Sequence, residues 1–459
     1  MTLIIYFLAL FIVVIVCYNL YVDAASQWSA ASADIVNLKN ALKALQASPV
    51  LPATPYNVLV DYQGSVFYYN IDVTRTGTWI NTMVGRKSKY ESMHIAFNTG
   101  VFYLDVNVQV VDQSFLKISG QGDGFISGVE KDFGPPPNGK INVNGGLTVL
   151  QVGPAVTEAF SFASSAQATS RFTGIHIRSL TLSGPSTSSA IQHGLVFVTD
   201  NDACSVTDVT IAGIAGIGVY NFAGDAFRVS HCQINELGTG VALVNCIHCA
   251  INDNLIGAQP IARATTINGR PYASGFDGIL GKDLYLSSCE YTTVNSNLLY
   301  PNGWSIIHAV NAYNTVISSN TIESYYVGAV MLQACTIAAL SNNVIRVPGD
   351  RHTNTDIQTI GSDTVQRDAS FGLISLMSCT AVSMAGNVVY CPPSCKRILN
   401  LTGGANNAHS ICSNQLLDPT SPETINVEGG NNAQIIIYDN LRSKQFYSDV
   451  SQDQSTLFR

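Results

Sequence analysis

The feature that most constrains this chain of 459 residues is a short internal repeat. A phrase of the form apolar, polar, any residue, Asn, any residue, apolar recurs, with Cys in the Asn slot of its first copy. The slot is filled by Cys232, Asn254, Asn297, Asn320, Asn343 and Asn387. The steps between these positions are 22, 43, 23, 23 and 44 residues, one or two units of about 22. A repeat of this length, built from short alternating strands without a helical partner, is typical of a solenoid.

We therefore predict an all-β chain that folds as a right-handed parallel β-helix with three short strands per coil. Asn414 and Asn440 continue the slot downstream, so the solenoid domain is expected over 51–440, with a C-terminal tail at 441–459. Leucine-rich repeats have a similar length but need a fixed Leu ladder, which this sequence lacks. Charged residues make up only 12% of the chain, which argues against a coiled coil or a disordered protein.

The repeated Asn and a series of cysteines are both expected to be scaffold. In a solenoid each turn residue lies over its counterpart in the next coil, and Asn tolerates the left-handed backbone conformation while its amide hydrogen-bonds along the stack. Four cysteines are also spaced by about two coils, at steps of 43, 46 and 44: Cys246, Cys289, Cys335 and Cys379. A core ladder of free thiols is the expected arrangement. Cys391 and Cys395 are the best local candidates for a disulfide.

The N-terminus carries a hydrophobic segment, Leu3–Val22, of 20 residues without charge. This is long enough to span a bilayer core, so residues 1–24 are interpreted as a transmembrane anchor or a signal segment. The chain is then membrane-anchored with an extracytoplasmic ectodomain, or secreted if the segment is cleaved. Residues 25–50 are expected to form a helical stalk, because apolar residues follow heptad spacing at Ile35, Leu38, Leu42 and Leu45. The alternative is a single amphipathic helix lying on the next domain.

Composition and motifs exclude several functions. The net charge of -8 and pI near 5.4 argue against nucleic acid as a partner, because such binding requires concentrated positive charge. Residues 134–140 resemble a phosphate loop, but Ile141 stands where Ser or Thr is needed and three prolines remove backbone amides. Cys246 and Cys249 resemble half of a zinc site without a second pair at ligand spacing. No metal and no cofactor are expected.

Carboxylates on a solenoid face are the remaining candidates for chemistry. Cleavage of a glycosidic bond typically needs two carboxylates, or one carboxylate with a base. Asp225 and Glu236 are the conspicuous pair, because they bracket the strand of one coil. Their separation of 11 residues is half a coil, so the alternative is that both are solvated turn residues on different faces.

Several phrases between Asn98 and Val347 carry a family resemblance. They are 98–104 (NTGVFYL), 116–122 (LKISGQG), 199–202 (TDND), 224–226 (GDA) and 297–305 (NLLYPNGWS). Together they resemble the inulin fructotransferases and the related difructose dianhydride hydrolases, with Glu following the Asp-Ala element by 11 residues as in that family's essential acids. The resemblance implies catalysis by Asp225 and Glu236, a homotrimer of right-handed β-helices, and a sugar site near the subunit contact. The implied reaction is cyclising cleavage of a β-2,1-linked fructan to a difructose dianhydride.

Three functions stay open. The first is a membrane-tethered fructan-cleaving enzyme, and the second is a hydrolase that acts on difructose dianhydride or another glycan. The third is a non-catalytic trimeric spike or adhesin that displays the β-helix on a surface, and the predicted anchor and stalk fit this function. Residues 258–276 are expected to be a loop inserted near the site. Aromatic candidates for lining a groove are Tyr300, Trp304, Tyr325 and Tyr326.

Overall fold

The computed structural model of the chain divides into two units, 1–55 and 56–459, and the described residues all belong to the second unit. They are residues 56–458 without 125–146, 166–170, 185–191, 215, 259–265, 268–269, 272–281, 300–304, 324–327, 347–356, 361–362, 367–372, 391–396, 404–405, 418–422, 428–434, 439 and 443–456. The predicted anchor and stalk lie outside this set. No helix among the described residues is long and apolar enough to cross a bilayer.

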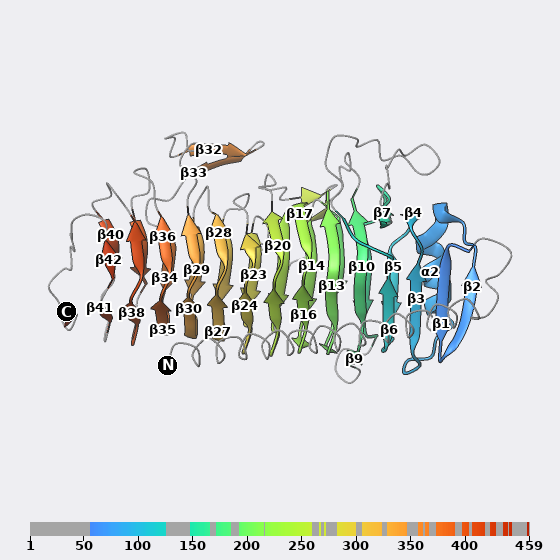
Figure 1. Cartoon of the computed structure of the whole chain (residues 1–459), viewed down its shortest axis with the longest axis horizontal. Coiled ribbons are helices and arrows are strands. Elements are labelled where there is room, and N and C mark those ends of the chain that lie inside the picture. The colour runs from blue at the N-terminus through green and yellow to red at the C-terminus, as the bar shows by residue number, and fades with distance from the viewer. Residues whose placement is uncertain are drawn as a thin grey trace, which may run out of the picture. The chain divides into compact units, whose positions relative to one another are not determined.

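An 11-stranded parallel sheet forms the first face of the solenoid (Figure 1). Its strands follow one another along the axis in chain order, and they alternate with the strands of the other faces. They are β5 (Val108–Val111), β8 (Glu158–Ala163), β11 (His193–Phe197), β14 (Ile217–Phe222), β18 (Thr239–Val244), β23 (Lys282–Ser287), β26 (Ser305–Val310), β29 (Gly328–Gln333), β34 (Ile374–Met377), β37 (Arg397–Thr402) and β40 (Glu423–Val427).

The second face is also parallel. Its strands are β3 (Met93–Phe97), β6 (Leu116–Ser119), β10 (His176–Ser183), β13 (Ser205–Ala212), β16 (Arg228–Ser230), β19 (Ala250–Asn252), β24 (Thr293–Asn295), β27 (Tyr313–Ser318), β30 (Thr336–Ser341), β35 (Thr380–Ala385), β38 (Ser410–Cys412), β41 (Ile436–Tyr438) and β43 (Leu457–Phe458).

The third face continues from the second, because β10 and β13 bend at Ser179 and Asp208 and pair on both faces. Its other strands are β4 (Gly100–Leu104), β7 (Thr148–Val152), β17 (Gln233–Leu237), β20 (Leu255–Ala258), β25 (Leu298–Leu299), β28 (Thr321–Glu323), β31 (Val344–Arg346), β36 (Val388–Tyr390), β39 (Gln415–Leu417) and β42 (Leu441–Arg442). Three short strands per coil and the parallel β-helix are confirmed, whereas the handedness stays a prediction.

The core is made by inward-facing side chains that stack in register from coil to coil. Strand alternation places one apolar residue of each second-face strand inside the solenoid. One such stack is fully or almost fully buried over nine coils: Ile177, Val206, Val229, Ile251, Val294, Ile317, Leu340, Met384 and Ile411. Because each coil buries its apolar face against its neighbours, no single repeat is stable alone.

The predicted Asn ladder is present, and each side chain bonds along the stack. The Nδ2 of Asn297 donates to the Oδ1 of Asn320 at 2.9 Å, and the Asn320 amide repeats this toward Asn343 at 3.0 Å. The pattern runs from Asn254 to Asn440. The left-handed conformation, however, belongs to the residue before each Asn, for example Ser296 and Ser319, so that part of the expectation is wrong. The side-chain Oδ1 of each Asn also accepts from the backbone N–H of the Asn in the coil before it, as Asn320 does from Asn297.

All eight described cysteines are free, and the predicted core ladder of Cys246, Cys289, Cys335 and Cys379 is buried. Burial raises the pKa of the Cys204 thiol to about 12, because a thiolate is poorly solvated inside the solenoid. These thiols therefore act as small apolar groups. Cys391 and Cys395 lie outside the described residues.

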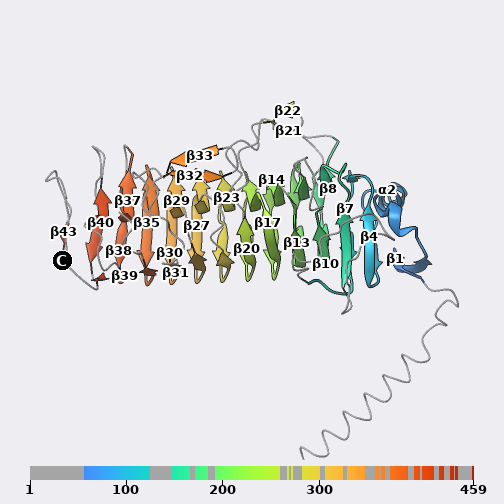
Figure 2. The same cartoon turned by 90° about the horizontal axis from the view of Figure 1, so that it is seen from above.

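The N-terminal end of this unit departs from the repeat. A β-hairpin of β1 (Val58–Tyr62) and β2 (Ser65–Tyr69) pairs antiparallel with β3. A 3-10 turn, η1 (Val73–Arg75), leads into α2 (Thr76–Val84), a helix that the sequence analysis did not predict and that packs on β4 and β5 (Figure 1). Two further hairpins lie between coils: β21 (Thr266–Ile267) with β22 (Arg270–Pro271), inside the predicted insertion, and β32 (Ile357–Ile360) with β33 (Asp363–Gln366) (Figure 2).

Candidate functional site

A bend between the first and second faces lies six residues before each position of the Asn slot. At this bend one residue per coil has a left-handed backbone, including Ala203, Ala226, His248 and Tyr291. The N–H of each donates to a carbonyl of the next coil, as from Ala226 to Ile247 at 3.0 Å. The bend therefore repeats in register, and its outward side chains form a line along the solenoid. The residues just before the left-handed ones pair in register from Asp202 through Asp225, Ile247 and Glu290 to Tyr313. We call the group of outward side chains at this bend formed by Arg171, Asp200, Asp202, Asp225, His248, Tyr291 and Tyr313 the corner ladder.

The predicted acid Asp225 lies in the middle of this ladder. It belongs to a small parallel sheet of β9 (Phe172–Thr173), β12 (Asn201–Asp202) and β15 (Gly224–Asp225). In this sheet Asp202 is paired with Asp225, so two carboxylates lie on neighbouring strands. Adjacent strands are separated by only ~4.8 Å, which brings the two negative charges close together.

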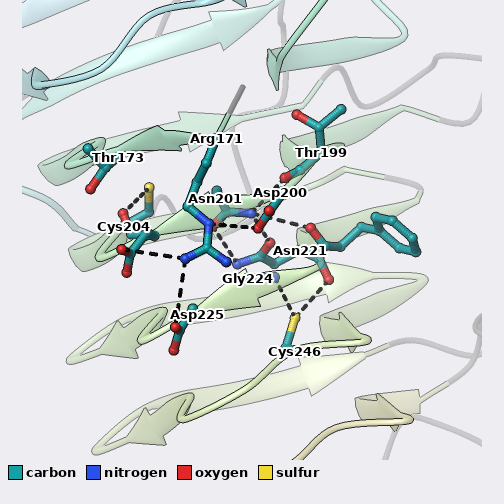
Figure 3. A network of polar contacts seen from close by, with 12 residues as sticks. Arg171, Thr173, Thr199, Asp200, Asn201, Cys204, Asn221, Gly224, Asp225 and Cys246 are labelled. Atoms are coloured by element: carbon teal, nitrogen blue, oxygen red, sulfur yellow. Dashed lines mark hydrogen bonds and ion pairs between the residues drawn. The ribbon is translucent and has the colours of Figure 1, made fainter. Parts of the chain in front are cut away.

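Arg171 offsets this negative charge (Figure 3). Its Nε lies 3.0 Å from the Oδ1 of Asp200, and its Nη1 lies 3.7 Å from Asp202 and 3.8 Å from Asp225. The side chains of Arg171 and Asp225 keep 45% and 35% of their surface exposed. Exposed ion pairs contribute little to stability. The fold therefore does not depend on the contacts of Arg171 with these carboxylates, and a ligand can replace them.

The backbone under Asp225 is fixed from the core side (Figure 3). Asn201 and Asn221 are fully buried, and the Nδ2 of Asn201 donates to the Oδ1 of Asn221 at 2.6 Å. A Cβ at Gly224 would lie 2.3 Å from the Nδ2 of Asn221, so the residue before Asp225 has to be glycine. The N–H of Gly224 donates to the Sγ of Cys246 at 3.4 Å. A rigid layer therefore supports the exposed carboxylate.

On the other side of Asp225 the ladder becomes aromatic. The Nδ1 of His248 lies 3.2 Å from the Oδ1 of Asp225, and the His248 ring stacks on Tyr291 with centroids 5.2 Å apart. Tyr291 meets Tyr313 edge to face at 5.7 Å. Both tyrosines are exposed, with 44% and 37% of their surface accessible. Exposed aromatic rings beside hydrogen-bonding carboxylates suit a ligand with apolar faces and hydroxyl groups.

Glu236, the second predicted acid, lies elsewhere in the coil. It is in β17 on the third face, where the pairing with β20 shifts register between Asn235 and Leu237. β16 and a bend separate it from Asp225 along the chain, and the two residues belong to different ladders. The side chain of Glu236 lies outside the described residues, so its role stays a prediction.

Sequence reasoning proposed Asp225, which stays a prediction, and did not predict the residues that surround it: Arg171, Asp200, Asp202, His248, Tyr291 and Tyr313. A signal for two of them was present: His248 and Tyr291 stand six residues before Asn254 and Asn297, as Ala226 does before Cys232. The aromatic candidates at 300, 304, 325 and 326 lie outside the described residues.

The fold is similar to that of DFA-IIIase from Arthrobacter chlorophenolicus A6. A mutant of that protein aligns with a TM-score of 0.59 at 17% identity, over 83% of this chain and 94% of the other. The complex with GF2 gives 0.57 at 19% identity, over 82% and 93%. The complex with DFA-III gives 0.53 at 20% identity, over 75% and 81%. No protein-family profile and no curated protein sequence matches the chain.

Proposed function

We propose that this chain is a glycan-cleaving enzyme that binds a fructan or fructo-oligosaccharide along the corner ladder and breaks a glycosidic bond at Asp225. The observation that carries the proposal is the position of Asp225, exposed between an arginine on one side and a His-Tyr-Tyr stack on the other. Such chemistry needs a reacting carboxylate next to a surface for sugar rings together with a second acid, the role proposed here for Glu236.

The contacts of Asp225 suit a charged carboxylate. Arg171 and His248 each present nitrogen atoms to it, and such contacts stabilise an ionised oxygen. In this proposal Asp225 stabilises positive charge at the fructosyl C2, or activates the sugar hydroxyl that attacks it. Glu236 then donates the proton to the departing glycosidic oxygen. Attack by a sugar hydroxyl gives a difructose dianhydride, and attack by water gives ring-opened or shortened products.

The separation of the two acids within one chain favours a site shared between subunits. Asp225 is on the bend between the first and second faces, whereas Glu236 is on the third face. In a homotrimer, the third face of one subunit can approach the corner ladder of its neighbour and complete the pair. Subunit complementation tests this assembly directly. Chains carrying Asp225→Asn are mixed with chains carrying Glu236→Gln, and the mixture is unfolded and refolded. Recovery of activity supports a shared site, and inactive mixed oligomers contradict it.

The substrate class rests on the structural likeness. DFA-IIIase, which has the similar fold, was crystallised with DFA-III and with GF2. The proposed ligand here is of the same kind, and a tether at residues 1–24 would hold the enzyme at a membrane with the solenoid outside the cytoplasm.

Product analysis tests the function. The full chain is incubated separately with inulin, GF2 and DFA-III, and the products are identified by chromatography and mass spectrometry. A cyclic disaccharide from inulin supports the fructotransferase reaction, and opening of DFA-III supports the hydrolase reaction. Binding of these glycans without any turnover supports instead the non-catalytic spike, for which the exposed His248, Tyr291 and Tyr313 provide the contact surface.

A further inference from the structure

The outer side of the second face carries a group of basic residues on three successive strands. Strand alternation directs His94 of β3, Lys117 of β6, and His176 and Arg178 of β10 away from the core. The register pairs His94 with Lys117 and Lys117 with His176. Because adjacent strands are ~4.8 Å apart, these four side chains share one small area, which we call the basic cluster.

Two serine hydroxyls complete the polar surface of the cluster. The Nε2 of His94 is 2.7 Å from the Oγ of Ser119, and the Nδ1 of His176 is 2.8 Å from the Oγ of Ser205. Ser119 lies in the register position of Arg178 on the neighbouring strand. Each imidazole is therefore held by a hydroxyl.

Burial and mutual repulsion both disfavour the charged forms of the residues in the basic cluster. Partial burial, followed by the charges of Lys117 and Arg178, lowers the pKa of His94 to about 4 and also lowers the pKa of His176. Partial burial and Arg178 lower the pKa of Lys117 as well. The surface thus concentrates positive charge that its own members disfavour.

Little negative charge compensates it. Asp61 pairs in register with His94 at one margin, and Asp208 lies at the bend of β13 at another. Within the described part of the chain, neither Lys117 nor Arg178 forms an ion pair. The protein as a whole is acidic, with a net charge of -8, so this local excess of cations is a specific feature of the face.

We propose that the basic cluster is a binding site for a doubly charged tetrahedral oxyanion, sulfate or phosphate, either free or carried as an ester on a glycan. Such an anion pairs with the Lys117 ammonium and the Arg178 guanidinium, and each His–Ser pair supplies one further hydrogen-bond donor to it, the imidazole N–H or the serine O–H. The ligand supplies the charge that the protein surface lacks. Cations in one group with surrounding donors are the usual means of recognising such anions.

The cluster adjoins the corner ladder. Thr173, which lies on the ladder's register next to Asp202, precedes His176 by three residues, and only the bend separates the two surfaces. A glycan bound at the corner ladder can therefore place an anionic substituent on the second face. The binding site itself does not rest on the proposed cleavage, because its test measures binding alone.

The test is calorimetric titration of the full chain at pH 7. Sodium sulfate is compared with sodium chloride at equal ionic strength, and dextran sulfate with uncharged dextran. The wild-type chain is expected to bind sulfate or dextran sulfate, whereas Lys117→Met and Arg178→Gln bind at least about tenfold more weakly. Arg75→Gln is the matched control, because Arg75 is an exposed arginine of η1 outside the cluster and its loss changes the net charge equally.

The outcomes separate the sources. Binding of inorganic sulfate supports a free anion, and binding of dextran sulfate alone supports an ester on a polymer. In either case NMR of the histidine Cε1–H signals should show that the bound anion raises the pKa of His94 and His176. The proposal is overturned if the wild-type chain binds neither probe, or if Arg75→Gln weakens binding as much as Arg178→Gln. Thermal unfolding of each variant without anion verifies that it is folded.

Discussion

The Nδ1 of His248 lies 3.2 Å from the Oδ1 of Asp225, although the two residues are 23 positions apart in the chain. The contact exists because the bend repeats in register: Asp225 pairs with Ile247 of the next coil, and the left-handed residue His248 follows directly after Ile247. It joins an acidic half of the corner ladder to an aromatic half.

Replacing His248 should reduce turnover more than substrate binding. His248→Ala removes the group that orients Asp225, and we expect kcat to fall about 10- to 100-fold, as for other positioning contacts. His248→Gln keeps a donor and should recover part of the rate. The matched control is His231→Ala, an exposed histidine with the same left-handed φ of 55° at the other bend. Equal losses in the two alanine variants would mean that only backbone strain matters.

Removing the aromatic rings should weaken binding and leave chemistry intact. Tyr291→Ala and Tyr313→Ala delete the exposed rings next to His248, and each is expected to raise KM about 2- to 10-fold with little change in kcat. Tyr390→Ala removes a tyrosine of similar exposure, 43%, from the third face. Steady-state kinetics on GF2 compare them. If Tyr390→Ala raises KM equally, the ladder does not bind the sugar.

The Asn ladder should carry much of the stability of the solenoid. Asn320→Ala removes the acceptor for both the backbone N–H and the Nδ2 of Asn297, each at 2.9 Å, in a fully buried position. We expect a loss of about 2–4 kcal/mol in the free energy of unfolding, measured by urea titration. Asn295→Ala, two residues before Asn297 and partly exposed, loses a single contact with Ser318 and should cost about 1 kcal/mol or less. An equal loss of unfolding free energy in the two variants would show that the Asn ladder contributes no more to stability than an ordinary side-chain contact.

Stability should decrease as the solution becomes acidic. Burial lowers the pKa of His193 and of His409 to about 4, and the Nδ1 of each accepts a backbone N–H at 3.1 Å. An unfolded histidine takes up a proton near pH 6.5, whereas the folded one does so only near pH 4. Between these values the unfolded state binds more protons, so the free energy of unfolding rises with pH through this window and falls as pH drops from about 6.5 to 4.

The measurement is the urea midpoint at pH values from 7.5 to 4.5, taken in steps of ~0.5 pH unit across the range in which histidines titrate. His409→Gln keeps an acceptor for Val382 and should flatten the decrease. A midpoint that rises on acidification would contradict this account.

Features that keep the same residue type from coil to coil could be predicted from the sequence. Features that keep only their position in the coil, and change residue type, could not. The Asn slot and the Cys series keep their residue type, so their stacking could be inferred from spacing alone. The bend keeps its left-handed residue but changes the type of that residue from coil to coil, from Ala203 to His248 to Tyr291. Arg171 contacts Asp200, Asp202 and Asp225 through its long side chain, and the spacing of residues in the sequence does not predict these contacts. The helix α2 occurs once, at the N-terminal end before the repeating coils, so the periodicity of the sequence did not predict it.

The most direct test of the central claim is the turnover of Asp225→Asn. The variant keeps the size of the side chain and removes its charge, and it is compared on GF2, inulin and DFA-III with Asp253→Asn, an exposed aspartate at the opposite bend. We predict that kcat/KM of Asp225→Asn falls about 10²- to 10⁴-fold with an unchanged unfolding midpoint, while Asp253→Asn keeps wild-type activity. Wild-type turnover by Asp225→Asn would contradict the proposal that this carboxylate acts on the sugar bond.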